Sequence, residues 1–338
     1  MTLHIFNPEH DIALASNLSN FTAPRAGRQL RTDLWWMPRL WAQENDVVWM
    51  KGVQLGGLPI TAVEPWGWDR AICAELRRAG VKDEVLPTDE MVQHIRQLSH
   101  RRTSAQLLPL LQMEGTVGEA FECKTVEEVT ELMQRYGRLV LKAPWSSSGR
   151  GVRFCENEKG EMRNENWVRN VIKAQGSMMA EPYYNKVKDF GMEFEADAEG
   201  RIHYLGLSLF HTVNGAYEGN ILATESVKRE MISRYIPISL LDSVKQRIVE
   251  RLHLDGYIGP FGIDMMIVKS IGNGNHNSQL SIVNCQLGLH PCVEINLRRT
   301  MGHVALSISP TDDDIRGVMR VVYDGNHYNL RIEPLKQR

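Results

Sequence analysis

The chain has 338 residues, of which 43% are hydrophobic and 24% are charged, and its net charge is -2. This composition is typical of a globular protein with more than one core, and it lacks the basic excess of a nucleic-acid binder. No apolar run approaches the roughly 18 residues that suggest a membrane span, and the N-terminus lacks the features of a signal peptide, so we expect a cytoplasmic protein without nucleic-acid or membrane partners.

The cysteine pattern argues against disulfide bonds and structural zinc. Five cysteines are present, an odd number, and no two are spaced as CxxC. Such a pattern indicates reduced thiols, in agreement with a cytoplasmic location.

The first hundred residues show alternating strand and helix signals. Residues 3–6 and 47–50 form short apolar runs that predict strands. Ile72, Leu76 and Ala79 share one face of a predicted helix over residues 69–79, and Gly80 follows as a stop signal. We therefore expect a small α/β domain over residues 1–104.

The rest of the chain alternates between strands and helices. Thr125 is an N-cap for a helix that ends at Gly137, and a second amphipathic helix is expected over residues 239–252. Apolar or alternating runs predict strands at 138–142, 152–154, 178–181, 190–196, 202–210, 259–268 and 280–284. A polar loop is expected at 272–278, and a short helix or a strand pair after residue 315.

A lysine and a glycine- and serine-rich loop form the first group with chemical potential. Lys142 ends a predicted strand and can place a point charge against a phosphate. The loop that follows can direct backbone N–H groups and hydroxyls toward an anion; it contains Ser146, Ser147, Ser148, Gly149, Arg150 and Gly151. Most such loops are only hairpin turns, and this one has neither the Walker A nor the GxGxxG spacing.

Oxygen-bearing side chains on two predicted strands form the second group. Asp264 interrupts an otherwise apolar strand, while Glu294 and Asn296, two residues apart, point to the same face of another. Carboxylate and amide oxygens are the hard ligands that magnesium prefers. The alternative is a salt bridge between Glu294 and a nearby arginine.

A third group follows the strand at 178–181. Backbone after Glu181, with Tyr183, could contact an adenine edge, and Asp189 or Glu193 could hold ribose hydroxyls. Each of these residues taken alone is equally compatible with a solvated surface loop.

Taken in order, these segments resemble the ATP-grasp superfamily over residues 100–310. The resemblance rests on LVLKAPWSSSGRGV (139–152), MMAEPYY (178–184), DFGMEFEAD (189–197), GPFGIDMMIV (259–268) and VEINLRRTMGHVA (293–305). It implies an α/β (α+β) ATP-grasp fold in three parts. These would be an N-terminal α/β domain (1–104), a lid (105–180) and a C-terminal antiparallel-sheet part carrying the metal ligands (181–338).

The resemblance also implies roles for the three groups. Lys142 would contact the α- and β-phosphates of ATP beneath the closing 146–151 loop, and Arg298 would meet the γ-phosphate or an acyl phosphate. Glu181 and Tyr183 would frame the adenine and Asp189 the ribose, while Asp264, Glu294 and Asn296 would hold one or two Mg²⁺ ions, with Mn²⁺ as a substitute. Families of this type have a second ATP-contacting lysine before the lid, where this chain has Arg101 and Arg102.

The resemblance predicts a ligase that activates a small carboxylate as an acyl phosphate and joins it to an amine. His211 and Asn220 are candidate substrate contacts in a polar, glycine-containing segment. Glu9 and His10 are further candidates because they follow the first strand, where ligands gather in open α/β sheets. Structural roles for all four residues remain alternatives.

Two other functions are alternatives to a ligase, and a third is disfavoured. A phosphotransferase would use the same site to make a stable phosphorylated product, and a non-catalytic nucleotide-binding protein would need fewer metal ligands. A Rossmann dehydrogenase is disfavoured because the first strand leads into Asn7-Pro8 instead of a glycine-rich turn. A homodimer is compatible with each of these functions.

Overall fold

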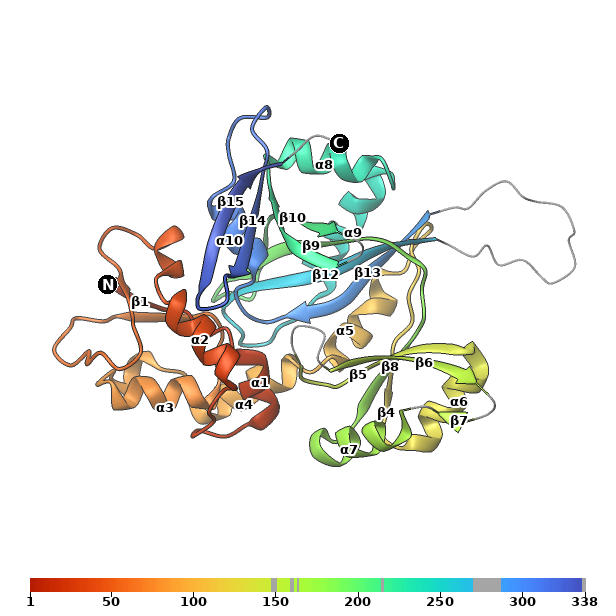
Figure 1. Cartoon of the computed structure of the whole chain (residues 1–338), viewed down its shortest axis with the longest axis horizontal. Coiled ribbons are helices and arrows are strands. Elements are labelled where there is room, and N and C mark those ends of the chain that lie inside the picture. Colours follow the sequence, from red (N-terminus) through yellow and green to blue (C-terminus); the bar gives the residue numbers. More distant parts are fainter. Residues whose placement is uncertain (147–150, 159–160, 163, 214–215, 270–286, 336–338) are drawn as a thin grey trace, which may run out of the picture.

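The described residues of this protein form three sheets (Figure 1). The computed structural model describes residues 1–146, 151–158, 161–162, 164–213, 216–269 and 287–335. The strand and loop expected at 280–284 and 272–278 lie outside these ranges. In the part of the chain that is described, no helix has the length and apolar character needed to cross a membrane.

The N-terminal part is built on a small parallel sheet in the order β2-β1-β3. Its strands are β1 (Thr2–Ile5), β2 (Val47–Val48) and β3 (Ala62–Pro65), and its helices are α1 (His10–Ser16), α2 (Arg25–Asp33), α3 (Arg70–Arg78) and α4 (Asp89–Leu98). Helix α3 begins where predicted, because the Asp69 carboxylate accepts a hydrogen bond from the Ile72 N–H. Leu3, Ile72 and Leu76 are buried together in the core of this part.

A second, antiparallel sheet has the order β4-β8-β5-β6-β7. Its strands are β4 (Phe121–Cys123), β5 (Arg138–Lys142), β6 (Val152–Glu158), β7 (Glu161–Met162) and β8 (Met178–Pro182), and its helices are α6 (Val126–Tyr136) and α7 (Glu165–Gln175). Thr125 caps α6 as predicted by accepting the Glu128 N–H, and Val129 and Met133 pack on Leu139 and Leu141. This packing fixes the strand that ends in Lys142.

The largest sheet is antiparallel and has the order β13-β12-β9-β10-β11-β14-β15. Its strands are β9 (Lys186–Ala196), β10 (Ile202–Val213), β11 (Ala216–Leu222), β12 (Gly259–Lys269), β13 (Leu287–Asn296), β14 (Gly317–Tyr323) and β15 (Tyr328–Pro334). The last two strands decide between the short helix and the strand pair that the sequence left open after residue 315, in favour of the strand pair. The helices packed with this sheet are α5 (Arg102–Leu107), α8 (Glu225–Ser233), α9 (Ile238–Arg251) and α10 (Met301–Ser307).

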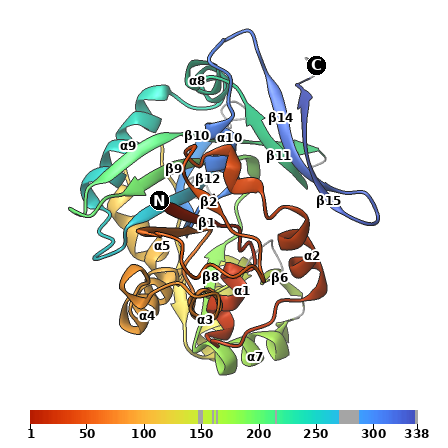
Figure 2. The same cartoon turned by 90° about the vertical axis from the view of Figure 1, so that its left-hand side faces the viewer.

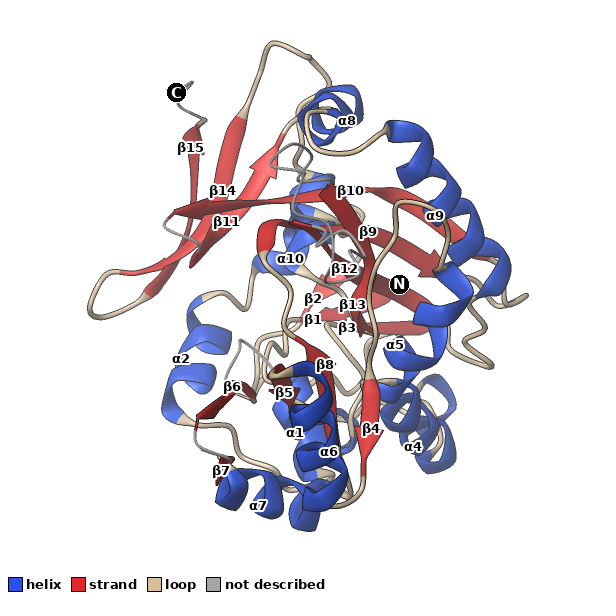
Figure 3. Ribbon diagram, turned by 90° about the vertical axis from the view of Figure 1, so that its right-hand side faces the viewer, coloured by secondary structure: helices blue, strands red, loops and turns tan. Residues whose placement is uncertain are grey.

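The two faces of the largest sheet have different roles. Phe190, Met192 and Phe194 of β9 share one face and pack in a core with Val244 and Ile248 of α9. The intervening residue Glu193 points to the other face, which α10 approaches; Figure 3 shows α9 and α10 at different sides of the strands. Figure 2 shows β1 and β2 in front of this sheet, whereas α1 lies below them, beside α3.

Candidate functional site

A cavity of about 440 Å³ opens at the polar face of the largest sheet. Charged side chains from all three parts of the fold meet at or next to it. Those that line the cavity are Arg101, Lys142, Glu193, Asp264, Glu294 and Arg298.

Asp264 and Glu294 are direct cross-strand partners. Asp264 of β12 pairs in register with Glu294 of β13, so both carboxylates lie on the same face of the sheet. Asn296 donates a hydrogen bond from Nδ2 to Asp264 Oδ2 at 3.2 Å. Burial, with the nearby charges of Glu294 and Glu193, raises the pKa of Asp264 to about 7. The three oxygen-bearing side chains that the sequence predicted to converge therefore do so.

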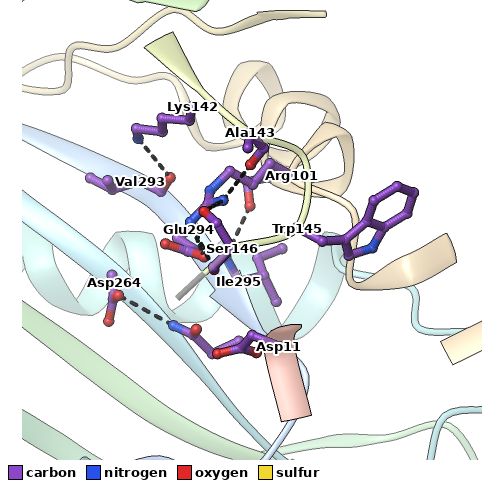
Figure 4. A network of polar contacts seen from close by, with 12 residues as sticks. Asp11, Arg101, Lys142, Ala143, Trp145, Ser146, Asp264, Val293, Glu294 and Ile295 are labelled. Atoms are coloured by element: carbon purple, nitrogen blue, oxygen red, sulfur yellow. Dashed lines mark hydrogen bonds and ion pairs between the residues drawn. The ribbon is translucent and has the colours of Figure 1, made fainter. Parts of the chain in front are cut away.

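Basic side chains surround this group, as the close-up in Figure 4 shows. The Arg101 guanidinium lies 2.6 Å from the Glu294 carboxylate, which is the salt bridge that the sequence left as an alternative. The Lys142 ammonium lies 2.6 Å from the Glu181 carboxylate and also donates to the Val293 carbonyl at 3.4 Å. Arg101 therefore contacts the carboxylate pair directly, and Lys142 contacts the backbone next to Glu294.

Arg298 is fixed by the N-terminal part. Its guanidinium donates two hydrogen bonds of 2.9 Å to the Asp11 carboxylate and one of 3.1 Å to Asn296 Oδ1. Burial alone would raise the pKa of Asp11, but Arg298 holds it below its usual value. Burial alone would lower the pKa of Arg298, but Asp11, Glu294 and Asp264 raise it. Arg298 therefore stays charged in the site.

The residues expected to contact the nucleotide are only partly brought together. Ser146 lines the cavity and accepts a hydrogen bond from Arg101 at 2.8 Å, whereas Ser147, Ser148, Gly149 and Arg150 lie outside the described residues. Gly151 lies against Ser146, because a Cβ at 151 would come within 2.3 Å of its side chain.

The three residues assigned to the adenine and ribose do not line the cavity. Glu181 is buried against Lys142. Tyr183 stacks under Arg138, whose guanidinium carbon is 4.0 Å from the ring centroid, and Asp189 pairs with Lys186 at 2.5 Å. Their roles stay predictions.

Of the four candidate substrate contacts, only Asn220 lines the cavity. His211 lies on β10, paired with Gly219 of β11, and does not line it. His10 is buried 3.2 Å from Asp69, and Glu9 pairs with Arg31 at 2.7 Å, so both are anchored in the N-terminal part. His10 also lines a small adjoining pocket with Glu294 and Asn296.

Glu193, which the sequence offered only as a possible ribose contact, lines the cavity. Its side chain is 3% exposed and accepts a hydrogen bond from Thr300 Oγ1 at 2.9 Å, and His303 Nδ1 lies 3.0 Å away. A Cβ on Gly302 would lie 1.8 Å from Glu193 Oε1, so the absence of a side chain at 302 makes room for this carboxylate. The sequence signal for this arrangement, one glycine early in a short helix, is too weak to interpret without coordinates.

Comparison with known proteins agrees with the architecture. No family model matches the chain. An N5-carboxyaminoimidazole synthetase from Staphylococcus aureus superposes with a TM-score of 0.50, at 13% identity, over 96% of this chain and 83% of its own. A biotin carboxylase from Campylobacter jejuni gives a TM-score of 0.47, at 13% identity, over 95% of this chain and 75% of its own.

One curated protein is similar in sequence over a shorter stretch. The small subunit of a 2-oxoglutarate carboxylase from Hydrogenobacter thermophilus is 33% identical over 87 residues, which are 25% of this chain and 18% of that protein. The match thus spans less than a fifth of that relative's length. The likeness to the synthetase covers nearly the whole chain and agrees with the motifs gathered around the cavity: the chain has the ATP-grasp fold.

Proposed function

We propose that this protein is an ATP- and magnesium-dependent ligase that activates a small carboxylate as an acyl phosphate and joins it to an amine or a similar nucleophile. The observation that carries the proposal is the convergence of Asp264, Glu294 and Asn296 in one cavity with Lys142 and Arg298. The names of the structurally similar synthetase and carboxylase support this class of reaction.

Asp264, Glu294 and the amide oxygen of Asn296 would hold magnesium. The fit is supported by the crowding of negative charge, since burial and two neighbouring carboxylates raise the pKa of Asp264 to about 7. A hard divalent cation bound by one or two carboxylates and by substrate phosphates suits such a group. When bound, the ion would neutralise charge on the phosphates.

The basic residues would position and neutralise the anionic reactants. Lys142 would exchange its contact with Glu181 for phosphate oxygens, and Arg101 would bind phosphate once Glu294 turns to the metal. Arg298, held in place by Asp11, would stabilise the charge that develops as a carboxylate oxygen attacks the γ-phosphorus.

The part of the cavity lined by Glu193 and Asn220 would receive the amine. Both residues are almost fully buried. A carboxylate held by Thr300 at a fixed position can accept hydrogen bonds from an incoming amine and later take its proton as the amine displaces phosphate. The amine would then lie beside the proposed metal ligands, because Glu193 is close enough to Asp264 for its charge to raise the pKa of that carboxyl.

Calorimetry with ATP and magnesium tests the proposal directly. We expect binding by the purified protein, and loss of turnover in a Glu294→Gln, Asn296→Ala double variant whose circular dichroism is unchanged. Glu114→Gln, at an exposed turn residue, is the matched control. Absence of ATP binding by the parent protein overturns the nucleotide assignment.

A screen of phosphate release by the purified protein distinguishes a ligase from a phosphotransferase. In a screen of small carboxylates and amines, a ligase releases phosphate only when both substrates are present. A phosphotransferase forms a stable phosphorylated product without an amine, and slow turnover with every acceptor supports a non-catalytic nucleotide-binding protein.

A further inference from the structure

A second cavity, of about 330 Å³, lies within the N-terminal part. All its lining residues fall between positions 6 and 75, and they begin directly after β1. The carboxyl ends of parallel strands are where ligands bind in open α/β sheets. Helix α1 lies between the two cavities: Ala13 lines the second, whereas Asp11 reaches Arg298 of the first. The second cavity is therefore a separate space.

Two oxygen atoms on residues lining this cavity have no hydrogen-bond partner among the described residues. Asn7, 1% exposed, donates from Nδ2 to the Gly67 carbonyl and to Asp69, which leaves Oδ1 unpaired. Glu9 uses Oε1 for Arg31, which leaves Oε2 unpaired. Buried acceptors almost always have a donor in native proteins. The missing donor is best supplied by a molecule inside the cavity.

The charges already present favour a cationic donor at Glu9. Arg31, 6% exposed, divides its guanidinium between Glu9 and Glu75, and Lys51 also pairs with Glu75. Glu75 thus has two cations, while Glu9 shares one and keeps an oxygen unpaired. An ammonium group satisfies this oxygen with a charge-assisted hydrogen bond.

The remaining walls combine apolar and aromatic side chains with Thr22, Thr32, Asp69 and Arg28, whose guanidinium donates to the Ala23 carbonyl. The large apolar and aromatic side chains that line the cavity are Phe6, Phe21, Trp35, Trp49, Met50 and Ile72. Sites for small molecules have this character, with apolar walls, a few fixed polar groups and volumes of roughly 300–1,000 Å³. Water alone would satisfy the acceptors but would leave the aromatic walls hydrated.

We propose that this cavity binds a small primary amine with an aromatic or large apolar body, whose ammonium group donates to Asn7 Oδ1 and Glu9 Oε2. Such an amine could come from two sources, the acceptor substrate or a separate effector. The contact through α1 gives an effector a route to the active-site cavity, because the same helix carries the Asp11 that holds Arg298.

Binding can be measured without nucleotide, on the full chain. The probes are phenethylamine, hexylamine and 3-phenylpropionate, followed by calorimetry and by the fluorescence of Trp35 and Trp49, which line the cavity. We expect both amines to bind and to change the fluorescence, and the carboxylate to bind at least about tenfold more weakly. Equal or tighter binding of the carboxylate, or no amine binding at millimolar concentration, overturns the proposal.

Two variants locate the site from two different segments that line the cavity. Glu9→Gln removes the charge and should weaken amine binding by about tenfold or more. Ala71→Leu fills the cavity from α3 and should abolish binding without touching a polar group; Ala74→Leu, on the same helix outside the lining, is its control. Since the two changes disturb folding differently, unchanged binding in a folded variant of either kind places the amine elsewhere.

Turnover assays separate the two sources. With ATP and magnesium, an acceptor amine is consumed in proportion to phosphate release, whereas an effector changes the rate and is recovered intact. Because binding is measured without ATP, failure of the ligase proposal leaves the result for this cavity unaffected.

Discussion

Arg101 and Glu294 form an ion pair of 2.6 Å that joins the start of α5 to β13. The same guanidinium donates to the Ala143 carbonyl at 2.5 Å and to Ser146 Oγ at 2.8 Å, so it also holds the loop after β5. The neighbouring Arg102 points elsewhere and lies 3.2 Å from Glu122. Of the two arginines that replace an expected lysine, Arg101 is therefore the one at the cavity.

Arg101→Ala and Arg102→Ala form a matched pair that tests this assignment. We expect Arg101→Ala to weaken ATP binding by about tenfold or more, because a charge-assisted contact to phosphate is lost. Arg102→Ala removes a half-exposed ion pair, which is worth about 0–1 kcal/mol, and should leave ATP affinity unchanged. Calorimetry on both variants decides the matter, and equal affinities would contradict the role given to Arg101.

The sequence predicted the strands that carry the site better than the contacts between them. Side-chain alternation was enough to place Glu294 and Asn296 on one face, and the interruption of an apolar strand was enough to single out Asp264. The bond from Asp11 to Arg298 joins residues 287 positions apart, and no local pattern encodes it. Long-range contacts of this kind follow from how the sheets pack, and that packing is decided by the whole chain.

Contacts between remote segments also explain why some candidate residues lie elsewhere than the sequence predicted. Glu9 and His10 follow β1 as expected, but their partners Arg31 and Asp69 come from α2 and the start of α3 and hold them within the N-terminal part. Ligands tend to gather at strand ends, and a cavity lined by Glu9 does lie after β1. The same tendency could not distinguish this cavity from the larger one at the polar face of the largest sheet. The sequence indicated Gly302 only as part of a motif. The space that it leaves is needed for the carboxylate of Glu193, whose strand is far away in the sequence.

Asp264→Asn should stabilise the protein while removing its response to magnesium. The pKa of Asp264 is raised from 3.8 to about 7, so the folded state binds the proton more tightly than the unfolded state. Stability is therefore lost as pH rises from about 4 to 7, and the ionised, half-buried carboxylate costs up to about 4 kcal/mol above that window. In chelator at pH 8, the variant should have the higher melting temperature.

Adding magnesium supplies the control for this variant. The parent protein should gain stability with increasing Mg²⁺ concentration, because a ligand that binds only the folded state raises its stability. The Asp264→Asn protein should show a much smaller gain. A lower melting temperature than the parent at pH 8 in chelator would show that Asp264 is not under electrostatic strain.

His290→Leu should reduce the sensitivity of the fold to acid. His290 is fully buried on β13, neither ring nitrogen has a hydrogen-bond partner in the described ranges, and its ring meets Tyr184 at 5.5 Å. Burial, with the nearby charge of Lys142, lowers its pKa from 6.5 to about 3. Below pH ~6.5 the unfolded state therefore binds a proton at this histidine, whereas the folded state does not. The free energy of unfolding decreases as the pH is lowered from about 6.5 to about 3.

The expected loss from this one histidine is about 2 kcal/mol at pH 5. Leucine cannot take up the proton and leaves no unpaired nitrogen. The variant should therefore be at least as stable as the parent at pH 7.5, and its stability advantage should be larger at pH 5. Thermal unfolding at the two pH values measures the difference. His100, whose pKa is also lowered to about 3 by burial, remains in both proteins and keeps part of the acid sensitivity. Parallel pH profiles would refute the role of His290.

Gly302→Ala should damage both the fold and the acceptor end of the cavity. The added Cβ would lie 1.8 Å from Glu193 Oε1 and 2.5 Å from Ser208 Oγ, so one of these buried groups has to move, at a cost of about 1–3 kcal/mol. Gly27→Ala is the control, because Gly27 is also helical and its new Cβ would come no closer than 3.6 Å to its neighbours. Gly27→Ala should be neutral or stabilising by up to about 1 kcal/mol.

A Glu193→Ala background removes the closest clash, so the cost of Gly302→Ala should be smaller there than in the parent, as measured by a double-mutant cycle of melting temperatures. The same cost in both backgrounds would mean that Glu193 does not fill the space beside residue 302.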